Sequence, residues 1–148
     1  MRYKNTDAVP IKEEGMKPVF YQKERMIDVL HKGVCGGHKF CILNLGTHPT
    51  AYVECKLKDC NDYHDVRLWD IPVHGGFTYF GNSYWDETDK TKYLGWDYAH
   101  CDDFAGYYEE GTYLAETTKS WTTEEIYAEV LNAISHLVDI ERSNENAE

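Results

Sequence analysis

The sequence predicts an α+β fold: a mostly antiparallel sheet with one short N-terminal helix and one long C-terminal helix, in a single domain. Three observations carry this prediction. Short β-branched and aromatic stretches alternate with turn residues in the middle of the chain, an apolar stripe at helical spacing lies near its end, and 42% of the 148 residues are hydrophobic. A chain of this length can bury its own core without disulfides.

The N-terminal part of the chain is predicted to begin with a flexible arm, residues 1–18, which is polar and interrupted by prolines and a glycine. A short helix is predicted at Phe20–Lys32, with Gly33 as its C-terminal cap. This helix prediction depends on an apolar stripe at helical spacing, formed by Met26, Ile27 and Leu30.

Five stretches are predicted as strands because β-branched and aromatic residues are frequent in them and turn residues bound them. Residues 38–45 and 51–57 flank the turn at 46–49, so we expect them to pair as a β-hairpin. In the second stretch Ala51 and Val53 are expected on one face and Tyr52 on the other. The remaining strands are predicted at residues 66–73, 77–80 and 93–98, and residues 104–113 are ambiguous.

The long C-terminal helix is predicted at Thr123–Arg142. Thr122 and Glu125 form a capping-box pattern, in which the hydroxyl accepts from an amide three residues on and the glutamate reaches back. The apolar stripe is wide enough to pack on a sheet, and its centre consists of Ile126, Val130, Ala133, Ile134 and Leu137. Residues 143–148 are predicted to form a polar tail.

The chain is acidic: 26 Asp and Glu against 15 Lys and Arg give a formal net charge of −11. This charge repels nucleic acid and anionic membranes and favours a basic partner protein. Residues 1–19 contain no apolar signal segment, and no stretch is apolar enough to cross a bilayer, so we expect a cytoplasmic protein. The odd count of five cysteines fits reduced thiols in that compartment.

The strongest candidate for a chemical site is a set of histidines and carboxylates in segment 74–103. Its members are His74, Asp97, His100 and Asp103. Residues three apart on a strand point to opposite faces, so the chain must turn near Ala99 to gather these side chains. Two imidazoles with one or two carboxylates suit Zn²⁺ best, and Fe²⁺ or Mn²⁺ less well. Cys101 and Asp102 are substitute ligands if the register differs. The alternative to a metal site is two ordinary hydrogen-bonded histidines beside a turn.

A second metal hypothesis uses thiolates. Cys55 and Cys60 together with Cys35 and His38 have spacings that could assemble a zinc site. The interpretation as small buried hydrophobic residues is favoured, because Cys55 is expected to face the core beside Val53. The sequence contains no nucleophile elbow and no phosphate-binding glycine loop.

Two acidic segments are candidates for contact with a basic partner, because tyrosine supplies contact area and carboxylates pair with Arg or Lys. The competing interpretation is a pair of solvated loops. The candidate partner-binding residues are Asp86, Glu87 and Asp89 in the first segment, and Tyr107, Tyr108, Glu109 and Glu110 in the second.

Two sequence runs carry a resemblance to known proteins. Val73-His74-Gly75-Gly76-Phe77-Thr78-Tyr79 and Gly95-Trp96-Asp97-Tyr98-Ala99-His100-Cys101-Asp102-Asp103 resemble the paired motifs of a group of small phage and prophage proteins. The common form of the second motif has glycine before its last aspartate, where this chain has Asp102. That difference leaves open which carboxylate corresponds.

The size and acidity also resemble those of type II-A anti-CRISPR proteins, which inhibit an RNA-guided nuclease and include a zinc-containing protein. The resemblance implies a zinc ion at His74, Asp97, His100 and Asp103, a phage protein acting in the host cytoplasm, and inhibition by binding rather than by chemistry. Such nucleases hold nucleic acid in basic channels, so we expect an acidic protein that docks on the nuclease to block nucleic-acid loading.

Two other functions stay open. With four protein ligands a metal would be structural, whereas three ligands would leave a position for an activated water, as in a small metal-dependent hydrolase. A protein that binds a nucleotide signal is the other alternative. The base of the bound nucleotide would stack on Tyr79, Trp85 or Trp96.

Overall fold

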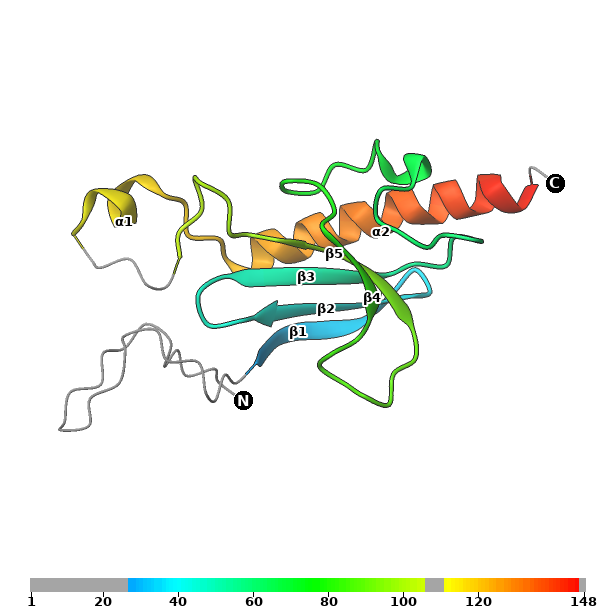
Figure 1. Ribbon diagram of the computed structural model, residues 1–148, viewed down its shortest axis with the longest axis horizontal. Coiled ribbons are helices and arrows are strands. Elements are labelled where there is room, and N and C mark those ends of the chain that lie inside the picture. Colours follow the sequence, from blue (N-terminus) through cyan, green and yellow to red (C-terminus); the bar gives the residue numbers. More distant parts are fainter. Residues whose placement is uncertain (1–26, 106–110, 147–148) are drawn as a thin grey trace.

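The computed structural model describes residues 27–105 and 111–146 and contains a five-stranded antiparallel sheet with a long helix along one face (Figure 1). The strand order is β1-β2-β3-β5-β4. In chain order the elements are β1 (Asp28–Cys35), β2 (His38–Asn44), β3 (Pro49–Glu54), the 3₁₀ helix η2 (Val66–Leu68), β4 (Tyr79–Asn82), β5 (Lys92–Asp97), α1 (Tyr113–Thr117) and α2 (Thr123–Asn146). The predicted antiparallel sheet and the predicted long C-terminal helix are thereby confirmed.

The first three strands form two consecutive hairpins. Gly36 and Gly37 connect β1 to β2 with φ angles of 57° and 79°, and Cys35 pairs with His38 across them. A two-residue loop with two positive φ angles matches the right-handed twist of the flanking strands. The predicted hairpin around the turn at 46–49 is confirmed, since β2 and β3 pair antiparallel.

The prediction of a helix at Phe20–Lys32 is wrong over its described part, because Asp28–Lys32 belong to strand β1. Ile27 and Leu30 pack on opposite faces of the sheet, where a helix would have placed them on one side. Residues three apart on a strand point in opposite directions, so the spacing that suggested one face of a helix places these two residues in different apolar clusters. Residues 20–26 and the predicted arm at 1–18 lie outside the described residues.

Two further predictions need correction, and one helix was missed. Residues 66–73 form no strand. Residues 66–68 form η2 and the rest is irregular, and Leu68, Ile71 and Val73 point into the core. Asp65 caps η2 by accepting a hydrogen bond from the amide of Arg67 (3.0 Å), which favours a turn over an extended chain. The predicted polar tail is helical as far as residue 146, and the short helix α1 was not predicted.

The sheet separates two apolar clusters. The larger lies between the sheet and α2, and includes Ala51, Val53 and the helix residues of the predicted stripe. The smaller lies on the opposite face and consists of Cys41, Leu43, Tyr52 and Tyr93. The predicted alternation in β3 is confirmed, because Ala51 and Val53 face one cluster and Tyr52 the other.

Helix α2 begins with the predicted capping box. The Glu125 amide donates to Thr122 Oγ1 (3.1 Å), and the Thr122 amide donates to Glu125 Oε1 (3.0 Å). All five central residues of the predicted stripe are buried. Among the described residues, no helix has the length and apolarity needed to span a membrane.

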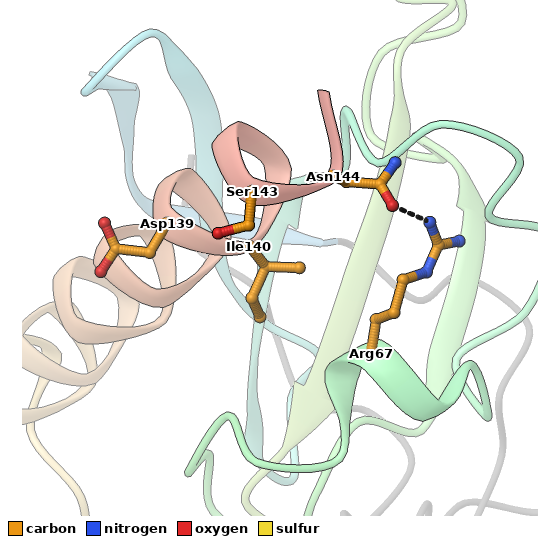
Figure 2. Close-up of a pocket in the computed structure, with 5 residues that line it drawn as sticks. All are labelled: Arg67, Asp139, Ile140, Ser143 and Asn144. Atoms are coloured by element: carbon orange, nitrogen blue, oxygen red, sulfur yellow. Dashed lines mark hydrogen bonds between the residues drawn. The ribbon is translucent and has the colours of Figure 1, made fainter. Parts of the chain in front are cut away.

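The far end of α2 is fastened to the sheet by a buried ion pair. His38 Nε2 lies 2.7 Å from Glu141 Oε1, and both residues are buried. Glu141 Oε2 also accepts from the Lys56 amide (2.9 Å). One turn further on, Arg67 donates to Asn144 across a pocket of about 430 Å³, which Figure 2 shows between η2 and the helix.

The ion pair predicts a pH-dependent stability. The hydrogen bond to Glu141 outweighs the effect of burial and raises the pKa of His38 above its ordinary value. The contribution of the protonated imidazole is therefore complete below about pH 6.5 and is lost as the pH rises through the folded-state pKa. Glu141→Gln should cost roughly 1.5–3 kcal/mol at pH 6 and less at pH 9, measured by urea denaturation at both values.

The matched control is Glu145→Gln, which removes an exposed carboxylate from the same helix. It should change the free energy of unfolding little at either pH. An equal loss for Glu141→Gln at pH 6 and pH 9 would contradict the assignment of the charge to His38.

Candidate metal centre

The pairing of β4 with β5 brings the two halves of the predicted site together. Tyr79 pairs with Gly95 in antiparallel register. His74 lies five residues before Tyr79 and His100 five residues after Gly95, so the register sets the two histidines opposite one another. Thr78 extends the contact, because its amide donates to the Gly95 carbonyl (2.8 Å).

Two turns then aim the side chains inward. The Gly76 amide donates to the Val73 carbonyl (2.9 Å), and Gly75 has a φ of 71°. On the other segment the Ala99 amide donates to Asp97 Oδ1 (3.0 Å), and the Asp103 amide to the His100 carbonyl (2.9 Å). The predicted turn near Ala99 is confirmed.

The structure gathers three of the four predicted ligands. His74, His100 and Asp103 each offer one ligand atom, and these atoms lie within 4.8 Å of one another. This is the one such group among the residues that the structure describes. A pair of imidazoles with a carboxylate can hold Zn²⁺, Fe²⁺ or Mn²⁺, so the group by itself identifies no particular metal.

Asp103 is the hub of the group. Its side chain is buried and accepts from three donors: His74 Nε2 (2.8 and 3.0 Å), Trp121 Nε1 (2.8 Å) and the His100 amide (2.9 Å). Burial alone would raise the pKa of Asp103, but these hydrogen bonds outweigh it and hold the pKa below its ordinary value. The carboxylate is therefore kept ionised, as a metal ligand must be.

His100 supplies an orphaned polar atom. Its Nε2 is buried and has no hydrogen-bond partner. A Cβ atom on Gly75 would lie 2.1 Å from that nitrogen, so only glycine at position 75 leaves room for the ring. A buried, unpaired nitrogen costs free energy unless something binds it, and a metal ion at the gathered group would do so.

Asp97 lies next to the group but outside it. Its Oδ1 is 3.5 Å from His100 Nε2, without hydrogen-bond geometry. Both carboxylate oxygens already accept protein hydrogen bonds, Oδ1 from the Ala99 amide and Oδ2 from Thr78 Oγ1 (3.3 Å). Asp102 is exposed, so the carboxylate that joins the histidines is Asp103.

Two aromatic residues of the site were not among the predicted ones. The ring of His74 stacks on Tyr98 (4.9 Å between centroids, 4° between planes) and lies 4.9 Å from Trp121. Trp121 reaches the site because residues 102–104 pair with Lys119 just before α2. Tyr98 follows Asp97 in the motif and is signalled by it, whereas nothing in the sequence signals the pairing that positions Trp121.

The thiolate hypothesis finds less support. His38 is engaged with Glu141 and the Gly36 carbonyl (3.1 Å). Burial raises the pKa of the Cys55 thiol to about 12, and among the described residues the cysteines form no group of possible metal ligands. Cys35, Cys55 and Cys60 all pack against the larger apolar cluster, as buried hydrophobic residues would.

The predicted partner-binding residues are described in part. Glu87 is exposed, whereas Asp89 accepts from the Thr91 amide (3.0 Å) and Tyr93 Oη (2.6 Å) and lies 3.4 Å from Lys39 Nζ. Asp86 caps its own loop by accepting from the Thr88 amide (3.0 Å). The other four candidates, Tyr107, Tyr108, Glu109 and Glu110, lie outside the described residues.

The aromatic residues suggested for stacking on a nucleotide are engaged elsewhere. Trp96 is buried in the larger cluster, and Tyr79 and Trp85 pack against the smaller one. The ring centroids of Tyr79 and Trp85 lie 5.5 and 4.8 Å from that of Tyr52, so these two rings pack against the protein itself.

Fold and site together define the class of this chain: an antiparallel sheet covered by one long helix, with a His-His-Asp group at the end of β5 that could hold a metal ion. Comparison with protein-family models, with curated proteins and with solved structures finds no match for it.

Proposed function

We propose that this chain is an acidic, zinc-binding phage protein that inhibits a type II RNA-guided nuclease by docking on it. The observation that carries the metal part is the buried, unpaired Nε2 of His100 beside His74 and Asp103. The docking part is supported by the net charge of −11 and by the resemblance of the paired motifs.

In this proposal the zinc ion has a structural role although three gathered ligands leave a coordination position for water, because those ligands connect separate segments of the chain. The ligands come from the segment before β4 and the segment after β5, and Trp121, just before α2, donates a hydrogen bond to Asp103. An ion bound there would join two stretches of chain that are distant in sequence, and Asp103 connects them to a third through Trp121. Because the site does not preform in an unfolded chain, the free energy of binding would contribute to folding.

Docking depends on the attraction between this acidic protein and the basic nuclease. Type II nucleases hold guide and target in positively charged channels, and an acidic protein would cover or compete for that charge. Steering by complementary charge raises the association rate and weakens with salt. Inhibition would then need no chemistry at the metal.

Elemental analysis of the purified protein, with zinc titration followed by calorimetry, tests the metal. We expect one zinc per chain, and we expect His100→Ala to lose it. Zinc should also raise the midpoint of thermal unfolding of the wild type and leave that of His100→Ala unchanged. A wild-type protein that binds no transition metal would overturn this half of the proposal.

Binding to a guide-free type II-A nuclease at increasing salt tests the docking. The association rate should fall steeply from low to high ionic strength. Undiminished binding at high salt, or no binding at all, would rule out an electrostatic dock.

A metal-dependent hydrolase is the second candidate. The observation that favours it is that three ligands gather while Asp97 lies outside the group, which would leave a coordination position open for water. Zinc-dependent hydrolysis of an activated phosphodiester or ester, abolished in His100→Ala without loss of stability, would favour this function.

A further inference from the structure

The loop between β3 and β4 exposes a tryptophan beside buried neighbours. Trp69 is 71% exposed, whereas Leu68 and Ile71, on either side of it, are 2% and 5% exposed. The loop is thus anchored in the core by its aliphatic residues while it presents the indole to solvent. Tryptophan is highly buried on average, and an exposed one is frequently part of an interaction surface.

The indole is held in place before any partner arrives. Its Nε1 donates to the His64 carbonyl (3.0 Å), and the Trp69 amide donates to the Val66 carbonyl (3.2 Å). The preceding turn is fixed by Arg67, whose guanidinium donates to both oxygens of Asp65 (2.9 and 2.7 Å). A side chain that is already ordered loses little conformational entropy on binding.

Trp69 borders a pocket of about 240 Å³, named here the Trp69 pocket, which is lined largely by aromatic rings. The rings belong to Tyr63, His64, Trp69 and Phe77. Tyr63 and His64 support one another, with 4.2 Å between their centroids. Sites for small-molecule ligands usually measure about 300–1,000 Å³, so this pocket has the size for a single side chain.

The surrounding charge is negative. Segment 58–70 contains four aspartates against Lys58 and Arg67, and Arg67 is already paired with Asp65. Asp62, beside the His64 ring (3.3 Å), is exposed, and the hydrogen bond from the His64 amide lowers its pKa below the ordinary value. Asp70 follows Trp69 directly and is exposed. No carboxylate lines the pocket itself, but Asp62 lies against the His64 ring that does, and negative charge there favours a cationic group over an anionic one.

We propose that the Trp69 pocket receives an arginine side chain of the basic partner. A guanidinium stacks on aromatic faces and bonds a carboxylate in a planar, two-pronged geometry, which lysine cannot reproduce. A second pocket lies between η2 and α2, and its one acidic lining residue, Asp139, points away from Arg67 and Asn144 (Figure 2). This inference rests on the proposed function for the existence of a basic partner.

A peptide experiment tests the pocket without the nuclease. A short capped peptide with two arginines separated by glycine is titrated into ¹⁵N-labelled protein. The indole signal of Trp69, assigned from its loss in Trp69→Phe, is followed together with the backbone amide signals of the other pocket residues, which also measure binding by Trp69→Ala. We expect a saturable shift, and binding about fivefold to tenfold weaker for the equivalent lysine peptide and for Trp69→Ala. Equal binding of both peptides, or no effect of Trp69→Ala, would overturn the proposal.

Measuring binding of Trp69 variants to the guide-free nuclease tests the pocket separately from the proposed function. Trp69→Ala should weaken binding about tenfold, and Trp69→Phe should retain most of it. The matched control is Tyr113→Ala, which removes a similarly exposed aromatic residue (78%) from α1 and should bind as the wild type does. Urea denaturation confirms that each variant folds.

The outcomes are distinguishable. If the wild-type chain binds the nuclease and Trp69→Ala binds equally well, the Trp69 pocket is not the contact, although the proposed function stands. If the chain does not bind the nuclease but the arginine peptide still shifts the Trp69 indole, the proposed partner is wrong, and the pocket keeps its assignment as an arginine site.

Discussion

Replacing Asp103 with alanine is expected to destabilise the protein by about 3–5 kcal/mol even without a metal, the usual cost of breaking a buried charged network. The substitution leaves His74 Nε2, Trp121 Nε1 and the His100 amide without their common acceptor in a buried site. Each buried donor left unpaired costs about 1–3 kcal/mol. Urea denaturation of the metal-free protein measures the loss, and zinc titration should show no binding by the variant.

Asp102→Ala is the matched control for this experiment. Asp102 is the neighbouring carboxylate, its side chain is exposed, and its contact with Lys119 is made by the backbone carbonyl, which alanine keeps (2.8 Å). The variant should unfold within about 0.5 kcal/mol of the wild type and bind zinc with unchanged stoichiometry. Equal losses from the two substitutions would show that Asp103 has no special place in the site.

The sequence predicted an element correctly where its apolar spacing fits only one kind of secondary structure and its ends carry a clear cap or turn. Helix α2 followed from its stripe and the pair Thr122 and Glu125, and the hairpin of β2 and β3 followed from its turn. Strand β1 was missed because Ile27 and Leu30 satisfy helical spacing while packing on different faces of the sheet. The Gly36-Gly37 loop was the stronger local signal, since two positive φ angles are typical of a two-residue hairpin.

Much of the candidate site followed from residue types and from one geometric demand. A strand cannot gather Asp97, His100 and Asp103, so a turn was required, and it is present. Which carboxylate joins the histidines depends on the direction of each side chain after that turn, and sequence spacing does not determine it. The contact from Trp121 depends on pairing between residues 103 and 119, which leaves no periodic pattern.

The candidate metal centre and the Trp69 pocket share a stretch of chain. Ile71, Gly76 and Phe77 line the pocket, and His74 lies between them in sequence. An ion that fixes His74 would also restrict this stretch and thereby keep the pocket formed. Zinc removal should therefore weaken binding of the arginine peptide, although none of His74, His100 and Asp103 lines the Trp69 pocket.

Gly75→Ala is expected to abolish zinc binding and to destabilise the protein by more than the strain of its backbone. An L-residue at a φ of 71° costs about 1–2 kcal/mol. The added Cβ would also lie 2.1 Å from Nε2 and 2.5 Å from Cε1 of His100, so the ring must leave the group. Zinc titration and urea denaturation measure the two effects.

Gly76→Ala separates the clash from the strain. Gly76 has a similar φ of 81°, but a Cβ there meets nothing within 4 Å. This variant should lose only about 1–2 kcal/mol and still bind one zinc. Zinc binding by both variants would mean that His100 does not need the space over Gly75, and loss from both would assign the effect to the turn. Loss from Gly75→Ala alone would identify the missing Cβ at position 75 as the feature that admits the His100 ring to the site.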